Sequence, residues 1–543
     1  EAQPKLQFHI NNLRGDFSPR ISFHFMEKLE YKNSPVLGFI LNSKYYLYDR
    51  YSNSIFTVPR IFFEYLDDLI SLDTDEFTQK YHNIFSKEEI IDLFKTLDYC
   101  QNDKKLIKPN RIPKFTISSI YSNAKKVEKK LKKELTFLCI NITEECNLRC
   151  EYCIFSGKYT KSRRHNSNNQ IEWNYIEKGV NLFLEHSTDS NIRKIGFYGG
   201  EPLLYFDIIR KTINYVRSKC DNAIFTITTN ATLLKDKILS FFVENNVEIT
   251  ISLDGPQNIH DKNRIFPNGV GSFNTVIKNI ESIKRLHHDF FENNIKFSAT
   301  LSPGKYKIKD LIDFFTYDMF PTLKRADLPL SLNYINYEEN KYLSEVKYLD
   351  WTKKTENEIF KLYKKIHIKG INKTSEIPAV LRALPIHREM MYINLRSNIA
   401  FDEFKFFWPN GACIPGMRSI FLNSKGIFLP CEKLNSETEF CIGDVSTGFD
   451  IKKISQLIAD YSREIAPLCS NCWAFRFCGE CWTTAVKNGQ ISKDFRSQYC
   501  SYIKSYWARR LFLYTEIIEK NPKAFSYQGS IDYPEFMSHM INE

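Results

Sequence analysis

The sequence of 543 residues has no uninterrupted apolar run of membrane-spanning length and no signal-peptide pattern at its start. Both absences favour a cytoplasmic protein without a membrane partner. The secretion context in which its 14 cysteines would form a disulfide scaffold is also missing. Because ten cysteines fall into two groups with metal-ligand spacing, we expect a reducing, oxygen-poor compartment.

Length and charge set only broad limits. The chain is too long for one ordinary core, so two to four domains are expected. A net charge of +11 would suit an acidic partner. Much of this excess lies in the lysine-rich stretch 125–133, which we interpret as a solvated helix face. Charge alone therefore assigns no partner.

The middle of the chain alternates between predicted strands and helices. Strands are predicted at residues 135–142, 194–198, 223–228, 248–253, 296–301 and 330–335. Such alternation indicates a parallel sheet wrapped by helices, and a parallel α/β barrel carries its chemistry at the carboxyl ends of its strands. The fold class expected for residues 135–339 is therefore α/β.

The flanking segments differ from this pattern. Residues 1–112 contain two predicted strands around the turn 49–53, then two or three short helices, one of them opened by the capping box of Ser86 and Glu89. This order resembles a winged helix-turn-helix. Further segments are a connector helix at 113–134, a helical insert at 340–400, a cysteine-rich domain at 401–510 and a helical tail at 511–543.

The first cysteine group is Cys146-x3-Cys150-x2-Cys153, and no fourth cysteine follows in the same loop. Three thiolates can hold three irons of a [4Fe–4S] cube and leave the fourth iron without a protein ligand. A zinc site normally has four ligands in paired spacings, and a loop this rich in charge is a poor site for buried thiols. The spacing therefore favours a cluster with one open iron, which can bind and reduce a small molecule.

This run resembles the cluster loop of the radical S-adenosylmethionine (SAM) enzymes. Tyr152 occupies the aromatic position that precedes the third cysteine. The segment after the second predicted strand is similar to the one that binds the methionine amino group in these enzymes; it is Gly199, Gly200, Glu201 and Pro202. Glycine lets a backbone approach a ligand closely, and a carboxylate can accept hydrogen bonds from an ammonium group. The resemblance implies a partial (β/α)6 barrel that binds SAM.

Polar residues also end the third and fourth predicted strands. Thr229 and Asn230 either contact the cofactor or cap their strand. By resemblance to sulfatase-maturing and peptide-modifying members, Ser252 and Arg264 hold the methionine carboxylate, for which the planar fork of arginine is well suited. Asp254 is assigned a structural role in the turn between them.

The second group has seven cysteines, with Gly426 between the first two. They are Cys413, Cys431, Cys469, Cys472, Cys478, Cys481 and Cys500. This order resembles the SPASM domain, which carries two auxiliary [4Fe–4S] clusters. The spacing from Cys478 to Cys481 is one residue shorter than in the sulfatase-maturing members. A zinc ribbon would use four of these cysteines and leave three unexplained.

The family arrangement implies a ligand set for each auxiliary cluster. Cys413, Cys431 and Cys481 would bind the first, and the remaining four, Cys469, Cys472, Cys478 and Cys500, the second. The first cluster is then either open to a substrate thiolate or closed by another side chain, for which Cys441 is the nearest candidate. We interpret both Cys441 and Cys139 as core thiols.

Glu432 directly follows Cys431. It stands where sulfatase-maturing relatives carry an aspartate thought to take a proton from the substrate. It is either a base of this kind or a surface residue of a turn.

The resemblance implies a radical SAM/SPASM enzyme with three [4Fe–4S] clusters that acts on a ribosomally made precursor peptide. A flavodoxin- or ferredoxin-type reductant would supply the electron that cleaves SAM to methionine and a 5′-deoxyadenosyl radical, and this radical would abstract hydrogen from the peptide. An open first auxiliary cluster favours a cysteine thioether. Carbon–carbon or carbon–oxygen crosslinking and sulfatase-type maturation are alternatives.

The N-terminal domain is expected to capture the leader of the precursor peptide as an added strand. It can also be a domain that only packs on the enzyme. A different class, a DNA-binding iron–sulfur sensor, would use the same domain as its reader. A sensor does not need a complete SAM pocket, so no nucleic-acid partner is expected.

Overall fold

The computed structural model describes most of the chain. The described residues are 28–31, 35–107, 125, 128–153, 170–304, 306–318, 330–334, 345–395, 415–416, 419–434, 438–487 and 489–528. Cys413 lies outside these residues, as does most of the connector predicted at 113–134. None of the helices in the described ranges is long and apolar enough to cross a membrane.

An antiparallel sheet and three helices form the N-terminal domain. In spatial order the strands are β1 (Lys28–Glu30), β2 (Val36–Leu41), β3 (Lys44–Asp49) and β4 (Ser54–Val58). The helices are α1 (Arg60–Ser71), α2 (Thr74–Tyr81) and α3 (Lys87–Asp98). The predicted hairpin is β3–β4, and α3 begins with the predicted capping box at Ser86 and Glu89. Strands β1 and β2 go beyond what the sequence pattern predicts, whereas three helices fall within the expected two or three.

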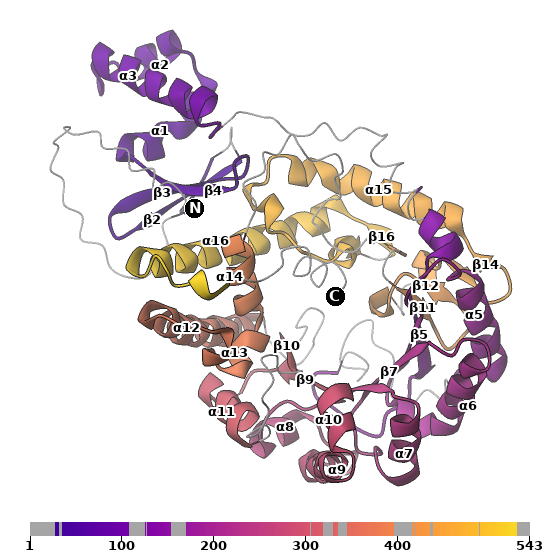
Figure 1. Ribbon diagram of the computed structural model, residues 1–543. Helices are drawn as coiled ribbons and strands as arrows, with labels where there is room; N and C mark the ends of the chain where they lie inside the picture. The colour runs from indigo at the N-terminus through magenta and orange to yellow at the C-terminus, as the bar shows by residue number, and fades with distance from the viewer. Residues whose placement is uncertain are drawn as a thin grey trace.

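A sheet of eight strands forms the centre of the molecule (Figure 1). The six strands that the sequence predicts form one parallel run in it: β5 (Phe137–Thr143), β6 (Lys194–Gly199), β7 (Ile224–Thr229), β8 (Glu248–Ser252), β9 (Ile295–Leu301) and β10 (Leu330–Tyr334). They lie side by side in sequence order. A hairpin of β11 (Ile420–Leu422) and β12 (Phe428–Leu429) extends the sheet beside β5.

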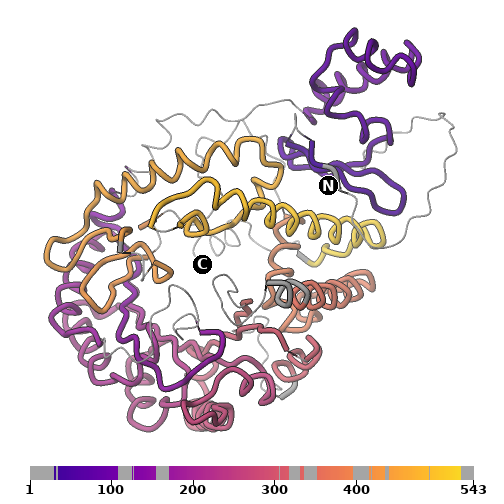
Figure 2. Tube along the Cα trace, turned by 180° about the vertical axis from the view of Figure 1, so that it is seen from behind, coloured from indigo at the N-terminus to yellow at the C-terminus, as the bar shows by residue number. Residues whose placement is uncertain are grey.

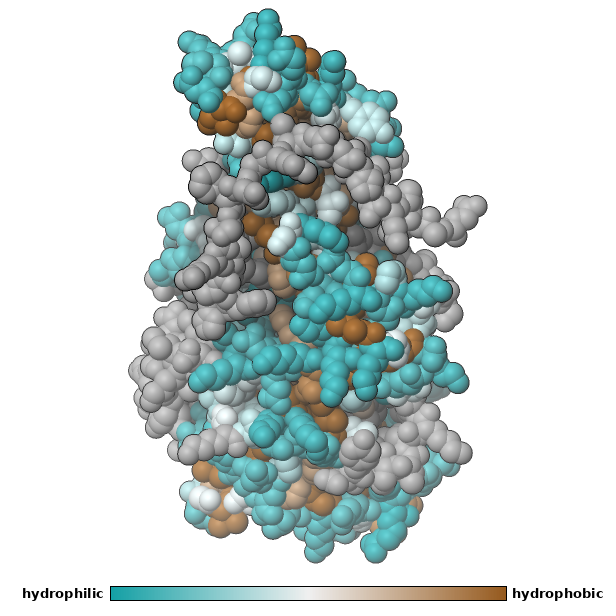
Figure 3. Space-filling view, turned by 90° about the vertical axis from the view of Figure 1, so that its left-hand side faces the viewer, coloured by the Kyte–Doolittle hydropathy of each residue, from teal (hydrophilic) through white to brown (hydrophobic). Residues whose placement is uncertain are grey.

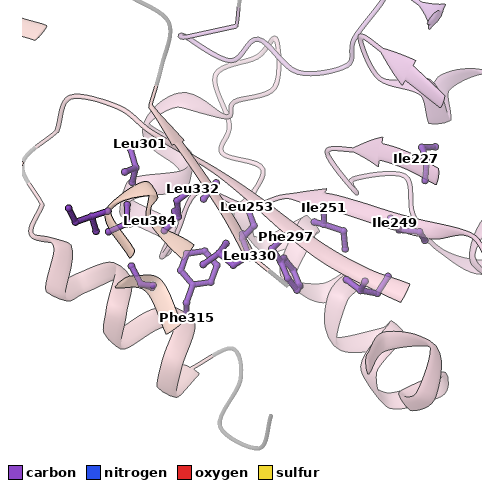
Figure 4. Close-up of a cluster of buried hydrophobic side chains, with 14 of the residues drawn as sticks. Ile227, Ile249, Ile251, Leu253, Phe297, Leu301, Phe315, Leu330, Leu332 and Leu384 are labelled. Atoms are coloured by element: carbon purple, nitrogen blue, oxygen red, sulfur yellow. The ribbon is translucent and has the colours of Figure 1, made fainter. Parts of the chain in front are cut away.

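One face of the parallel strands is apolar. Paired residues such as Ile195 with Phe225, and Ile227 with Ile249, are buried on this face. Figure 4 shows the cluster that continues it over β8, β9 and β10, where strand side chains meet Phe315 and Leu384. Burial of this face against helices is the main stabilising contribution to the barrel.

The covering helices lie on the outside of the arc of strands, as Figures 1 and 2 show. They include α5 (Trp173–Glu185), α6 (Phe206–Arg217), α7 (Asp236–Glu244), α8 (Gln257–Asn263), α9 (Phe273–Leu286), α10 (His288–Asn294) and α11 (Ile308–Asp313). Each parallel strand from β5 to β9 is therefore followed by a helix, which is the repeat that a partial barrel requires.

The helical insert and the C-terminal part close the other side of the molecule. The insert contains α12 (Glu345–Lys369), α13 (Ala379–Ala383) and α14 (Pro385–Leu395). The C-terminal part contains α15 (Ile451–Ser470) and α16 (Lys493–Lys520), so the domain boundary expected at residue 510 falls inside one helix. Buried Arg510 of α16 binds Glu356 of α12 and Glu389 of α14, which fastens the insert to this helix.

The N-terminal sheet packs on the C-terminal part rather than standing apart from it (Figure 1). Tyr48 of β3 contacts the rings of Trp473 and Phe477 at centroid distances of 6.2 and 4.9 Å. Lys44 forms an ion pair with Glu519 of α16 at 2.6 Å. Figure 3 shows the side that carries this domain, where hydrophilic residues predominate and apolar ones are scattered.

Candidate active site

The loop that carries the three cysteines begins at the end of β5 and lies against the glycines that end β6. Gly200 N–H donates to Thr143 O, and Glu201 N–H donates to Glu145 O, both at 2.8 Å. A Cβ atom on Gly199 would lie 2.2 Å from Thr143 O, and one on Gly200 would lie 2.1 Å from Glu145 O. Only glycine fits at either position, which gives the predicted glycine pair a physical reason.

The opposite side of the loop is held by the segment after β8. Arg149 N–H donates to Ile265 O at 2.7 Å, and Glu151 N–H donates to Asn263 O at 3.1 Å. The loop is thus fixed from two sides, by β6 and by the end of α8. This double attachment places its cysteines at the carboxyl edge of the parallel strands, as the sequence predicts.

The three thiols of this loop lie close enough together to influence one another electrostatically. Burial raises the pKa of Cys150 to about 12, and neighbouring Cys153 adds to the rise. Burial also raises the pKa of Cys146, with further contributions from Cys150 and Cys153. Such thiols stay protonated without a metal and release protons when they bind one, which fits a site built for iron.

The Glu201 side chain makes its hydrogen bonds with the protein itself. It is completely buried, and it accepts hydrogen bonds from Leu203 N–H at 3.1 Å, the Thr229 hydroxyl at 2.7 Å and Asn230 N–H at 2.7 Å. Burial raises its pKa to about 7. These bonds occupy most of the acceptor capacity of the carboxylate. Its main role in this geometry is to tie the end of β7 to the Gly199–Pro202 segment.

Thr229 and Asn230 have different surroundings. The Thr229 hydroxyl donates to Glu201 and accepts from Ala231 N–H at 3.0 Å, which is a capping arrangement. The Asn230 amide donates to Asn147 Oδ1 at 2.8 Å and lies 4.0 Å from the sulfur of Cys146. Asn230 therefore contacts the cysteine loop directly, whereas Thr229 does so only through Glu201.

Tyr152, Asp254 and Arg264 form a buried group beside the loop. The Tyr152 hydroxyl donates to Asp254 Oδ2 at 2.5 Å, and Arg264 Nε lies 3.0 Å from the same oxygen. The guanidinium of Arg264 has no other ion pair or hydrogen bond among the described residues, which leaves its two terminal nitrogens for a ligand. Ser252 ends β8 nearby and is half-buried. Here the side chain of Tyr152 has a partner, whereas the sequence indicates only the importance of its position.

Below this edge, the second face of the parallel sheet is polar. Its residues share a register across the strands and are only half-buried; they include Tyr198, Thr226, Thr228, Thr250, Ser298 and Thr300. Parallel sheets usually bury both faces in apolar contacts. A face of hydroxyl groups next to the cysteine loop is suited to a polar substrate, and it is absent from the sequence-based predictions.

Four cysteines of the second group lie within electrostatic reach of one another. Burial raises the pKa of Cys469, and its electrostatic neighbours include Cys478, Cys472 and Cys500. These residues come from the end of α15, the loop after it and the first half of α16. Buried Arg496 lies 3.8 Å from the sulfur of Cys478.

Cys431 and Cys481 form a second pair. Burial raises the pKa of Cys431, with Glu432 and then Cys481 as further causes. Cys139 of β5 also lies near Glu432 and Cys431, a proximity that the sequence does not indicate. Cys441 is directed elsewhere, because its thiol donates to Gly443 O at 3.1 Å. In the described part of the chain, no three His, Cys, Asp or Glu side chains lie close enough to hold a single metal ion.

Comparisons with known proteins agree with this site. Residues 140–305 match the model of the Radical SAM superfamily. The chain is 31% identical over 220 residues to a cysteine-type anaerobic sulfatase-maturating enzyme of Clostridium novyi, which is 38% of this chain and 57% of that enzyme. It is 30% identical over 216 residues to an uncharacterized protein of Methanocaldococcus jannaschii, 38% of this chain and 70% of that protein.

A solved structure also resembles the chain. It is native anSMEcpe with bound AdoMet and Cp18Cys peptide, with 19% sequence identity and a TM-score of 0.50 over 71% of this chain and 99% of the other. This likeness concerns the fold, which is that of a radical SAM barrel with a cysteine-rich C-terminal part.

The site and these matches define the class of the protein as a radical SAM enzyme. The chain belongs to the Radical SAM superfamily. Membership implies SAM and a [4Fe–4S] cluster. The loop of Cys146, Cys150 and Cys153 fits that cluster because it carries three thiols within electrostatic reach of one another at the carboxyl edge of the barrel strands.

Proposed function

We propose that the enzyme installs a crosslink in a ribosomally made precursor peptide, with a cysteine thioether as the favoured bond. The observation that supports this most is the placement of the cysteine loop at the edge of a sheet whose open face is lined by hydroxyl groups. With SAM and its cluster bound, the site would supply a 5′-deoxyadenosyl radical that abstracts hydrogen from the peptide.

The residues around the loop would bind and orient SAM. Asp254 holds Arg264 with its terminal nitrogens available for the methionine carboxylate, and Ser252 stands at the adjacent strand end. The backbone at Gly199 and Gly200 is close enough to the loop to shape the pocket for the amino group. The half-buried hydroxyl groups below would hydrogen-bond the peptide backbone and hold one C–H bond in place.

The bond that forms depends on the first auxiliary cluster, for which we propose Cys413, Cys431 and Cys481 as ligands. With only these three ligands, the fourth iron would bind a cysteine thiolate of the peptide. Glu432 stands next to Cys431 and would take the thiol proton. The match to the sulfatase-maturating enzyme covers only 38% of this chain and 57% of that enzyme. Sulfatase maturation is therefore a weaker candidate for this chain.

The four cysteines Cys469, Cys472, Cys478 and Cys500 are the proposed ligands of a second auxiliary cluster, which would pass on the electron left after crosslinking. A flavodoxin- or ferredoxin-type protein would be the reductant. The N-terminal sheet would take up the leader peptide along β4, one of its two edge strands, which is paired on one side only within the described residues.

Three measurements test this proposal. Reconstituted, reduced protein should convert SAM to 5′-deoxyadenosine, and the variant with Cys146, Cys150 and Cys153 changed to Ala should not. A precursor peptide encoded beside the gene should lose two hydrogens in the complete reaction. Its leader should also slow the hydrogen exchange of the amides in Ser54–Val58. Absence of 5′-deoxyadenosine would contradict the assignment as a radical SAM enzyme. Slower hydrogen exchange outside Ser54–Val58 would contradict the addition of the leader as a strand beside β4.

A further inference from the structure

The N-terminal domain contacts the C-terminal part where α15 ends, at the segment that carries Cys469 and Cys472. Arg50, in the turn after β3, is 3% exposed. Its Nη1 donates to the carbonyl oxygens of Cys469, Ser470 and Cys472 at 3.3, 2.7 and 3.2 Å. One guanidinium of the N-terminal domain therefore fixes the backbone between two proposed cluster ligands.

The turn that carries Arg50 is itself rigid. Asp49 accepts hydrogen bonds from Tyr51 N–H at 3.1 Å and from Ser52 N–H at 3.0 Å. Arg476, which follows the cysteine loop, donates back to Arg50 O at 2.8 Å and to Tyr51 O at 3.0 Å. The hydrogen bonds run in both directions, so a shift of this turn must move the cysteine loop.

A second connection reaches the same cysteines. Lys504 of α16 lies 2.7 Å from Glu30 of β1. Burial raises the pKa of the Cys472 thiol, while Lys504 and Arg50 both oppose that rise. Lys504 likewise opposes the rise at Cys500. Both cations therefore lie within electrostatic reach of the proposed cluster ligands. Arg50 belongs to the N-terminal domain, and Lys504 forms an ion pair with it through Glu30.

The electrostatic consequence follows from the charge that a cluster gains. A one-electron reduction makes a cluster with four thiolate ligands more negative, and nearby buried cations stabilise that state, since charges interact strongly where water is scarce. Arg496 also lies beside these thiols but belongs to α16 itself. Of the three cations, Arg50 and Lys504 depend on how the N-terminal sheet is seated.

We propose that Arg50 and the Lys504–Glu30 pair make the reduction potential of the second auxiliary cluster depend on the seating of the N-terminal domain. This inference rests on the second auxiliary cluster of the proposed function. Binding of a leader peptide that shifts the sheet changes the potential, and by thermodynamic reciprocity reduction of the cluster changes the affinity for the leader.

A redox titration tests the inference in a background that cannot cleave SAM, with Cys146, Cys150 and Cys153 changed to Ala. Dithionite supplies the electron, and electron paramagnetic resonance follows the auxiliary clusters. Arg50→Ala should shift the potential of the second cluster to more negative values, because a cation is lost. Glu30→Gln should shift it to more positive values, because Lys504 is no longer neutralised.

The control is Lys44→Ala, which breaks the ion pair with Glu519 between the same two parts of the chain, away from the cysteines. It should leave the potential unchanged. Shifts of the same sign in Arg50→Ala and Glu30→Gln, no shift in either, or failure of the background protein to assemble a second cluster would overturn the proposal.

Hydrogen exchange of the metal-free protein tests the contact without any cluster. Amides of residues 469–477 should exchange faster in Arg50→Ala than in Lys44→Ala, and equal exchange would contradict the coupling. Neither measurement involves SAM or peptide. If neither measurement gives the expected result while the native enzyme still cleaves SAM, the inference about the second auxiliary cluster is wrong and the proposed function stands.

Discussion

The Tyr152 hydroxyl donates a hydrogen bond to Asp254 Oδ2 at 2.5 Å, and the same oxygen pairs with Arg264. One residue of the cysteine loop thereby orients the arginine proposed for the methionine carboxylate. A hydrogen bond to a charged group contributes about 1.5–3 kcal/mol.

Tyr152→Phe removes this bond while keeping the ring. We expect SAM to bind about tenfold more weakly, which corresponds to about 1.4 kcal/mol, with unchanged iron content. Calorimetry of SAM binding measures the effect. The matched control is Tyr205→Phe, which breaks the bond between Tyr205 and Glu145 on the other side of the loop. Equal affinities of Tyr152→Phe and the native protein would show that Asp254 positions Arg264 without help.

Glu201 makes stability depend on pH. Its pKa rises from 4.5 to about 7 on folding, because burial disfavours the charged form. The folded state therefore binds more protons between these values, and the stabilisation is lost as pH rises through about 7. Since one pKa unit corresponds to about 1.4 kcal/mol, Glu201→Gln should gain up to about 3 kcal/mol relative to the native protein from pH 5 to pH 8.

Unfolding of the metal-free protein followed across this pH range measures the difference between the Gln variant and the native chain. A difference that stays constant with pH would mean that Glu201 is charged throughout and that its three hydrogen bonds outweigh the cost of burial.

Gly200 is required for steric reasons. A Cβ atom there would lie 2.1 Å from the carbonyl oxygen of Glu145. Gly200→Ala should displace the cysteine loop, so that bound iron falls by the content of one cluster. Gly269→Ala is the control, because Gly269 has a φ of +83° but a Cβ atom there would meet no other atom within 4 Å. Iron and sulfide analysis measures the cluster content of both variants. A full iron content in Gly200→Ala would contradict the close contact between the cysteine loop and Gly200.

Cys139 tests whether the first auxiliary cluster is open. The thiol lies near Cys431 and Glu432, yet we interpret it as a core residue. Cys139→Ala should keep the full iron content, as should Cys100→Ala, which removes a buried thiol of the N-terminal domain. Loss of iron in Cys139→Ala alone would identify Cys139 as a ligand. It would close the iron on which the thioether depends and favour a carbon–carbon or carbon–oxygen bond.

The parallel strands are well predicted from the sequence because each strand combines an apolar run with a polar or glycine end. Gly199, for example, ends β6 and has a φ of +135°, where a side chain would be strained. The strands β1 and β2 escape prediction because their pairing partners lie in the following hairpin, and pairing is not a local property of the sequence.

The partners within the site cannot be read from spacing. Nothing between Glu201 and Thr229 in the sequence indicates that the two side chains share a hydrogen bond, because sheet register brings them together. Arg50 and Cys469, which also share a hydrogen bond, are more than four hundred residues apart in the sequence. One missed feature does have a signal: polar and apolar residues alternate over residues 225–228 and in Glu248–Ser252, which indicates two unlike sheet faces.

The central claim is that a radical made from SAM takes hydrogen from a peptide held on the polar face of the barrel. The most direct measurement uses a precursor peptide deuterated on carbon, incubated with SAM and the reduced, reconstituted enzyme. The account predicts deuterium in the 5′-deoxyadenosine and a peptide that has lost two hydrogens. Cleavage of SAM with no deuterium transferred, while the peptide stays unchanged, would contradict it.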